Sequence, residues 1–133
     1  MKAMVNARAY RTVVIVGICL SVAILHLVLG GPYRGPWSTF VKGYLFDLLV
    51  PFALYFLLCQ LEPEHINLRW QWKAAIIVGF GLAVELVQLA GVRFFGSTFD
   101  LLDILAYAIG AMLAAAIDRL VLSRWLDFWT IRP

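Results

Sequence analysis

The sequence is poor in charged residues. Asp, Glu, Lys and Arg together make up 14% of its 133 residues, against about 25% in a soluble domain. Hydrophobic residues make up 63%, so a soluble protein of this length would lack the polar surface to cover them. These shares exclude a soluble globular domain, a disordered chain and a nucleic-acid binder that works through surface charge. The class of protein that remains is an integral membrane protein. We expect its partner to be the lipid bilayer and not a nucleic acid.

Residues that bind metals or activate nucleophiles are also scarce. The two cysteines, Cys19 and Cys59, both lie inside apolar runs, where they are typical small buried hydrophobes. There is no C-x-x-C pattern, no Cys/His spacing typical of a metal site and no glycine-rich phosphate loop. The sequence therefore implies no metal and no cofactor.

What the sequence does contain is long apolar runs. A transmembrane helix needs about 20 mainly apolar residues, and four stretches of a single domain (residues 1–133) qualify: 12–30, 43–60, 74–92 and 101–122. Short connections join them, with turn signals at Gly30-Gly31-Pro32 and Gly35-Pro36. Short connections make sequential helices antiparallel. We therefore expect an all-α, four-helix, up-down bundle that spans a membrane.

The placement of Lys and Arg predicts the orientation. The basic start of the chain and the first apolar run resemble a signal peptide, but the run is long and no clean cleavage site follows it, so we expect a retained helix. With a cytoplasmic N-terminus, eight Lys and Arg residues lie on the cytoplasmic side and three on the other side. Both termini are therefore expected in the cytoplasm, and the protein in the inner membrane of a bacterium. The cytoplasmic set is Lys2, Arg8, Arg11, Arg69, Lys73, Arg119, Arg124 and Arg132, and the other set is Arg34, Lys42 and Arg93.

Tryptophans support the same orientation. Trp70, Trp72, Trp125 and Trp129 fall at the inner interface and Trp37 at the outer one, as in an aromatic belt. Within residues 123–133, Trp125, Phe128 and Trp129 have helical spacing, which predicts a short interfacial C-terminal helix. The alternative is a frayed tail that the tryptophans anchor.

Ionisable side chains inside the spans are the most informative residues, because such groups usually face the bundle interior or a cavity. The predicted topology places the following at one level in the outer half of the bilayer: His26, Asp47, Glu85, Asp100 and Asp103. Asp118 and Arg119 fall at the inner end instead, where we expect each to have a partner elsewhere. Pro51 lies four residues after Asp47 and frees the carbonyl of that residue, so we expect a kink beside this carboxylate.

Helical spacing adds a shared face on each of two spans. Gly81, Glu85 and Gln88 lie on one face of the third span, and Gly81 permits close approach of another backbone. Asp103, Tyr107, Gly110 and Ala114 lie on one face of the fourth span. Packing these faces together places Arg93, from the connecting loop, above the acidic residues.

Each of these residues also has a purely structural explanation. Asp100 and Asp103 suit the start of a helix as caps or dipole partners. Glu85 and Gln88 suit hydrogen bonding between helices. His26 suits a position inside the bundle where its ring nitrogens have hydrogen-bond partners. A structural explanation is easy for any one of these residues but harder for several at the same depth. The candidates for a polar cluster or a ligand-binding site are therefore Glu85, Gln88, Arg93, Asp103, Tyr107, Asp47 and His26.

Residues 85–110 read ELVQLAGVRFFGSTFDLLDILAYAIG. This segment, about a fifth of the chain, resembles the VanZ-like family of small bacterial membrane proteins, whose pattern is E-x-x-Q, an arginine in the loop and D-x-x-x-N-x-x-G. Glu85, Gln88, Arg93, Asp103 and Gly110 match it, and Tyr107 stands at the asparagine position, as in related uncharacterised families with DLLAY. The resemblance implies a multi-helix protein of the bacterial inner membrane, with a family link to teicoplanin resistance and no settled enzymatic mechanism.

Three classes of function fit these observations. The first is a non-catalytic membrane protein, either an accessory subunit packed against other integral membrane proteins or a binder of a membrane amphiphile, in which Arg93 locks Glu85 and Asp103 together. The second is an enzyme on lipid-linked envelope material, with Glu85 or Asp103 as general acid or base and Arg93 on a phosphate. The third is a transporter or proton relay, for which four helices give a narrow path and no inverted repeat is evident. We expect the first.

Overall fold

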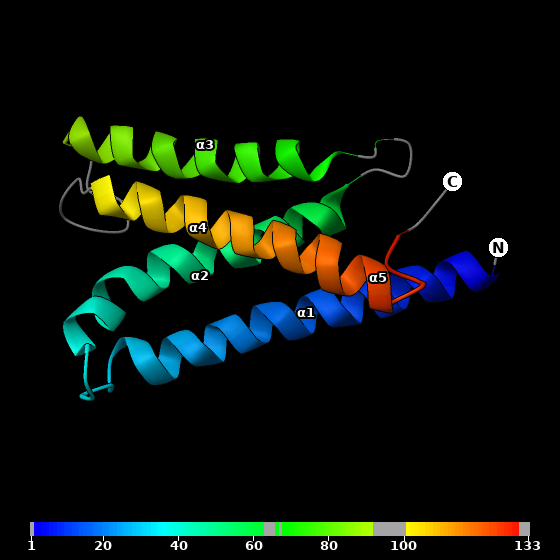
Figure 1. Ribbon diagram of the computed structural model, residues 1–133, viewed down its shortest axis with the longest axis horizontal. Coiled ribbons are helices and arrows are strands. Elements are labelled where there is room, and N and C mark those ends of the chain that lie inside the picture. Colours follow the sequence, from blue (N-terminus) through cyan, green and yellow to red (C-terminus); the bar gives the residue numbers. More distant parts are fainter. Residues whose placement is uncertain (1, 63–65, 67, 92–100, 131–133) are drawn as a thin grey trace.

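The computed structural model describes residues 2–62, 66, 68–91 and 101–130, and all regular structure in these residues is helical. Four long helices, α1 (Lys2–Gly30), α2 (Ser38–Leu61), α3 (Trp70–Leu89) and α4 (Leu101–Ile117), form the body. A π-helical segment, η1 (Asp118–Leu122), and a short helix, α5 (Ser123–Trp125), continue α4. Both ends of the chain lie at the same end of the molecule (Figure 1), which we call the terminal end.

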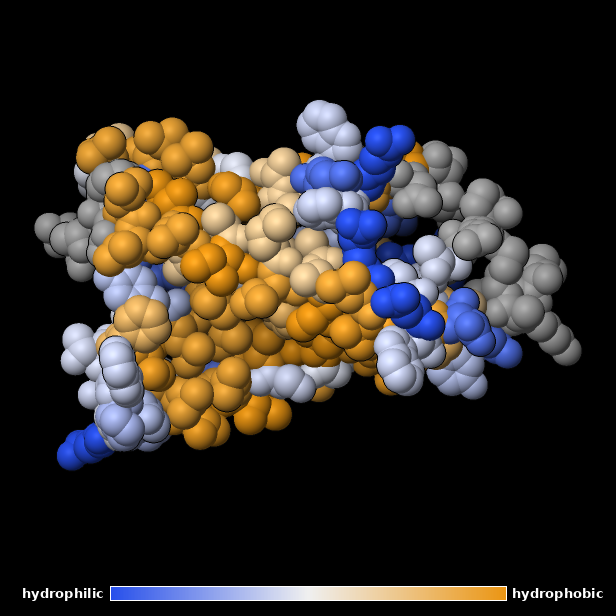
Figure 2. All heavy atoms as spheres, in the orientation of Figure 1, coloured by the Kyte–Doolittle hydropathy of each residue, from blue (hydrophilic) through white to orange (hydrophobic). Residues whose placement is uncertain are grey.

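All four long helices are long and apolar enough to cross a membrane. The candidate spans are Asn6–Gly30, Ser38–Leu61, Trp70–Leu89 and Leu101–Trp125. Each differs from its predicted span by a few residues, because helical structure continues into the basic and aromatic residues that flank the apolar runs. The pattern is that of a multi-pass membrane protein. Figure 2 agrees, with apolar side chains over the middle of the visible face and strongly hydrophilic ones gathered toward the terminal end.

α2 holds the bundle together, since it contacts α1, α3 and α4, while α4 also contacts α3. The apolar core lies nearer the terminal end. Its members come from all four long helices and the tail: Ile15, Tyr55, Phe56, Cys59, Ala74, Ile77, Ala111, Ala114, Ala115 and Trp129. The alanines keep α4 thin, so the large rings of α2 fill the space between the helices.

α3 ends where the backbone enters the left-handed region. Gly91 has φ 89°, a conformation that costs glycine little. The amide of Gly91 donates to the carbonyl of Gln88 at 2.9 Å, and that of Ala90 donates to Leu86 at 3.0 Å. These bonds satisfy carbonyls that a helix end otherwise leaves open. The helix therefore stops at Leu89, three residues before the predicted boundary.

The predicted helix that carries Trp125, Phe128 and Trp129 on one interfacial face does not form in the C-terminal tail. The helix α5 ends at Trp125, and Leu126 takes up an extended conformation. Trp125 is 81% exposed whereas Trp129 is 3% exposed, so the two indoles do not share one interfacial face. The tail folds back because Trp129 fills the core at the terminal end, a contact that helical spacing alone does not reveal.

Candidate functional site

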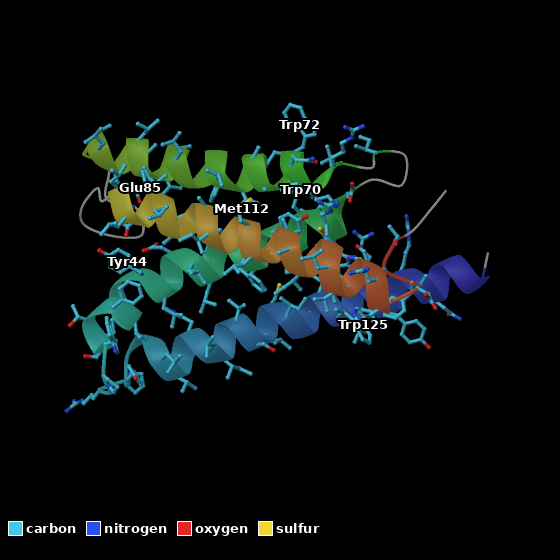
Figure 3. All side chains as sticks on the ribbon, viewed as in Figure 1. Tyr44, Trp70, Trp72, Glu85, Met112 and Trp125 are labelled. Carbon is cyan, nitrogen blue, oxygen red and sulfur yellow. The ribbon has the colours of Figure 1, made fainter. Side chains whose placement is uncertain are left out.

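Three carboxyl groups from three helices meet at the end of the bundle away from the chain termini. Asp47 of α2 interacts electrostatically with Asp103 of α4 and with Glu85 of α3, and the Asp47 and Asp103 side chains lie within hydrogen-bonding reach. Glu85 is 4% exposed, and Figure 3 shows it at the end opposite the termini. We call Asp47, Glu85 and Asp103, with Tyr107, the carboxyl cluster.

Tyr107 stands beside all three acidic residues. Its phenol interacts with Asp47, Glu85 and Asp103, and the side chain is buried between α3 and α4. Its ring lies against Gly81, where a β-carbon would collide with the ring atoms. The sequence predicts that Gly81 admits a neighbouring backbone. The structure differs, because the ring of Tyr107 takes that space, so the glycine and the tyrosine together set the approach of α3 to α4.

Gly110 sets the approach of α4 to α2. A β-carbon at this position would collide with the backbone carbonyl of Leu48 and would lie 2.8 Å from the ring of Pro51. Close approach of helices at small residues is typical of membrane proteins. Pro51 is buried inside α2 and has no N–H, so the carbonyl of Asp47 lacks its usual helical donor. The backbone on this side of α2 is therefore both closely packed and polar next to the carboxyl cluster.

The remaining predicted candidates lie around this cluster in different ways. Gln88 is half-buried on α3, one turn beyond Glu85. His26 of α1 packs its ring against Phe46, with 4.8 Å between centroids. Phe46 directly precedes Asp47 on α2, and the two side chains project about 100° apart. Arg93 and Asp100 lie outside the residues that the structure describes, and so does the predicted lock between Arg93 and the carboxylates.

The chemistry available to the carboxyl cluster follows from its groups. Like charges at this range destabilise one another unless a cation or a shared proton compensates. In the described part of the chain, no group of three or more His, Cys, Asp and Glu side chains is arranged to hold a metal ion. A positively charged group or a shared proton fits this arrangement, and the cation that the sequence predicts there, Arg93, lies outside the described residues.

A second polar arrangement, at the terminal end, centres on Asp118. The hydroxyl of Tyr55 donates to Oδ2 of Asp118 at 2.8 Å, and the indole N–H of Trp129 donates to Oδ1 at 2.6 Å. The guanidinium of Arg11 lies over the Trp129 ring, 5.4 Å from its centroid. We call Arg11, Tyr55, Asp118 and Trp129 the tail anchor. It satisfies a buried carboxylate with donors from α2 and the tail.

The π-helical segment η1 helps to place Asp118. The amide and the hydroxyl of Ser123 both bond to the backbone carbonyl of Asp118, the hydroxyl at 2.6 Å. Asp118 faces inward, whereas Arg119 places its guanidinium over the ring of Trp70 at 5.2 Å. The two neighbours therefore have separate partners, as we expected.

A third arrangement closes the connection between α2 and α3. Nζ of Lys73 lies 3.0 Å from Oε2 of Glu62, and the side chains are 8% and 9% exposed. Arg11 lies 3.8 Å from the same carboxylate and donates to the carbonyl of Cys59 at 2.8 Å. The amide of Leu68 also donates to Glu62. Because the last carbonyls of a helix have no helical donor, Arg11 completes the end of α2.

Sequence reasoning missed most of these terminal-end residues. Arg11 and Lys73 counted only toward orientation, Tyr55 lay within an apolar run, and Trp129 belonged to the predicted interfacial helix. One signal was present, since Asp118 is an acidic residue inside an apolar segment and needs donors. Which residues donate to Asp118 depends on which helices pack together, and no local sequence pattern shows that.

Comparisons of this chain with protein-family models, with curated proteins and with solved structures bear on the VanZ-like resemblance of residues 85–110. None of the three comparisons found a match.

Proposed function

We propose that this chain is a VanZ-like multi-pass protein of the bacterial cytoplasmic membrane with a non-catalytic role, in which the carboxyl cluster binds the positively charged head group of a membrane amphiphile. In this proposal the bundle has up-down topology and both termini are cytoplasmic. Support for this orientation comes from the distribution of cations. At the terminal end lie Arg8, Arg11, Arg69, Lys73, Arg119 and Arg124, whereas Arg34, in the connection between α1 and α2, and Lys42, near the start of α2, lie at the opposite end.

One observation carries the proposal. Asp47, Glu85 and Asp103 come from three helices, and Asp47 lies within interaction range of both Glu85 and Asp103. Glu85 is four residues from the end of α3, about 6 Å along a helix axis, and Asp103 lies in the first turn of α4. A cation bound among these carboxyl groups sits near the level of lipid head groups, with its apolar chain alongside the exposed helix faces. Complementary charge supports a cationic head group rather than a phosphate.

Two amphiphiles with the same alkyl chain and opposite charge test the proposal. With the protein in neutral maltoside micelles, we expect dodecylamine to raise the melting temperature and an equal concentration of dodecyl sulfate not to do so. The neutral variants Glu85→Gln and Asp103→Asn should fold, as judged by circular dichroism, and lose the response. Asp127→Asn is the matched control, because this exposed carboxylate lies in the tail at the other end. An equal rise in Glu85→Gln, Asp103→Asn and the unsubstituted chain contradicts the proposal.

An accessory subunit is the second candidate, and the exposure of α1 favours it. The span Asn6–Gly30 is the least buried of the four. Large apolar residues are exposed on more than one face of it: Val13, Val16, Leu20, Ile24, Leu25, Leu27 and Val28. Among them, Val13, Val16, Leu20, Ile24 and Leu27 have the three- and four-residue spacing of one helix face. A photo-crosslinking residue at Leu20 should then capture one integral membrane protein in intact cells. The matched control is the same residue at Phe80 of α3, which is also exposed. If the crosslinker at Leu20 forms adducts with lipid and with no protein, this candidate is contradicted.

The enzymatic alternative rests on the direct contact between Asp47 and Asp103. Two carboxyl groups that share a proton are able to act as acid and base. The expected result under our proposal is that the purified chain releases no inorganic phosphate from a polyprenyl diphosphate. Release that Asp103→Asn abolishes, with the fold intact, assigns a catalytic role instead.

A further inference from the structure

Exposed arginines and tryptophans gather where α3 begins and α4 ends. Arg69 precedes Trp70, the first residue of α3, and Arg119 lies across from them, with its guanidinium 5.2 Å from the centre of the Trp70 ring. Both arginines are exposed. Trp72 and Trp125 are exposed at the same end, where Figure 3 labels them with Trp70. Trp72 points away from the bundle on the outer side of α3 and Trp125 lies on the other side, near α1, so the two mark the same end but not the same face (Figure 3). The surface of Arg69, Trp70 and Arg119, which we call the arginine–tryptophan surface, takes no part in the carboxyl cluster.

Two described acidic groups at this end of the bundle have other partners. Glu62 accepts from Lys73, Arg11 and the Leu68 amide. Asp118 is buried and accepts from Tyr55 and Trp129. The positive charges of Arg69 and Arg119 therefore remain uncompensated by these two carboxylates and face outward. Stacking on Trp70 holds the guanidinium of Arg119 in place and leaves its N–H groups available to an acceptor.

The depth of this surface identifies its ligand. Exposed tryptophans at the ends of membrane spans sit at the level of the lipid head groups, and this surface lies where the candidate span Trp70–Leu89 begins and the candidate span Leu101–Trp125 ends. A guanidinium at that level meets lipid phosphates, which it binds through two parallel hydrogen bonds. Clustered Lys and Arg at a membrane surface favour anionic lipids over zwitterionic ones.

We infer that the arginine–tryptophan surface binds the phosphate group of an anionic lipid between the start of α3 and the end of α4. Arg69 and Arg119 contact the phosphate, and Trp70 holds the guanidinium of Arg119 beside it. The site is independent of the proposed function, because it lies at the other end of the bundle and uses positive rather than negative side chains.

The test measures lipid retention by the full chain. The protein is reconstituted in nanodiscs of phosphatidylcholine with 10 to 20 mol% phosphatidylglycerol (about one lipid in seven, a range chosen to keep the surface potential low). Native mass spectrometry after release then counts the phosphatidylglycerol and phosphatidylcholine that stay bound. We expect the double variant R69Q/R119Q to bind phosphatidylglycerol roughly tenfold or more weakly, since each arginine contributes about fivefold near an anionic surface. Retention of phosphatidylcholine should not change.

The double variant R34Q/K42Q is the matched control. It removes two exposed positive charges, the same number, at the opposite end: Arg34 from the connection between α1 and α2, and Lys42 from the start of α2. The inference predicts that it keeps its phosphatidylglycerol. An equal loss in both double variants shows attraction by net charge alone and overturns the site, as does an unchanged affinity in R69Q/R119Q.

Two further measurements keep the test decisive. R69K/R119K keeps both charges and should restore most of the binding, so it separates loss of the site from loss of the fold if R69Q/R119Q proves unstable. Inorganic phosphate, added to nanodiscs of phosphatidylcholine alone, should not raise the melting temperature at millimolar concentration. A rise that depends on Arg69 and Arg119 assigns the surface to a soluble phosphate and overturns the lipid assignment.

Discussion

The indole of Trp129 donates its N–H to the carboxylate of Asp118 at 2.6 Å, across eleven residues of sequence. The bond ties the tail to the end of α4, and the Trp129 ring also packs edge-on against Phe56 of α2 at 6.2 Å. Asp118 is the one acid of the fourth span that lies at the terminal end. Its burial is tolerable because both oxygens receive a donor. The tail is therefore part of the folded core.

The first prediction concerns this bond. Trp129→Phe keeps an aromatic ring and removes the donor, so one oxygen of a buried carboxylate loses its partner. We expect a loss of about 1–3 kcal/mol in the free energy of unfolding, measured by dodecyl sulfate titration in mixed micelles. Amide exchange over residues 126–130 should also speed up. Trp125→Phe is the control, since that ring is 81% exposed, and equal losses in the two variants contradict the prediction.

The second prediction concerns the ion pair that closes the α2–α3 connection. Lys73→Met leaves Glu62 with Arg11 at 3.8 Å as its remaining cation. Removing one member of a buried pair costs about 3–5 kcal/mol, and we expect the lower end because Arg11 partly compensates. In the same unfolding titration, Lys73→Met/Glu62→Gln should cost less than the sum of the single variants. Lys42→Met, at an exposed lysine, should change stability by less than about 0.5 kcal/mol.

The helices themselves were predictable from the sequence, for a physical reason. Each span must satisfy its own backbone within a run of apolar residues, so length and hydropathy suffice to find it. The structure has four candidate spans where four were predicted. The ends were less predictable, because interfacial residues such as Trp70 and Lys73 extend a helix without being apolar. The tail was missed because its fold depends on one distant carboxylate.

The candidate site was predictable only in part. Periodicity places Glu85 on the face of Gly81, and Asp103 on the face of Tyr107. That Asp47 joins them depends on the crossing of α2 and α4 at Gly110, which arises from packing between helices far apart in the sequence. His26 shows the limit of an argument from depth alone. It shares a level with the acids in the predicted topology, yet it packs on Phe46.

The third prediction uses the contact between Gly81 and Tyr107. Gly81→Ala introduces a β-carbon that collides with the ring of Tyr107, and overpacking of this kind costs about 1–3 kcal/mol. Tyr107→Ala removes the ring, so Gly81→Ala should cost almost nothing in that background. A double-mutant cycle by unfolding titration measures the difference, and strictly additive losses contradict the contact.

The last prediction concerns the crossing of α4 over α2. Gly110→Ala places a methyl group against the carbonyl of Leu48 and the ring of Pro51. Backbone atoms cannot rotate away as a flexible side chain can, so we expect a loss near 3 kcal/mol, the upper end for overpacking.

Gly79→Ala is the matched control, because a β-carbon there meets no atom within 4 Å among those placed in the structure. Its effect should be a small gain, about 0.5–1 kcal/mol, because alanine has less backbone entropy than glycine to lose from the unfolded chain. Both variants add one methyl group to one transmembrane helix, so hydrophobicity and expression are matched. Unfolding titration in mixed micelles then isolates packing. If Gly110→Ala proves as stable as Gly79→Ala, α4 does not cross α2 at this glycine, and the position of Asp103 beside Asp47 loses its structural basis.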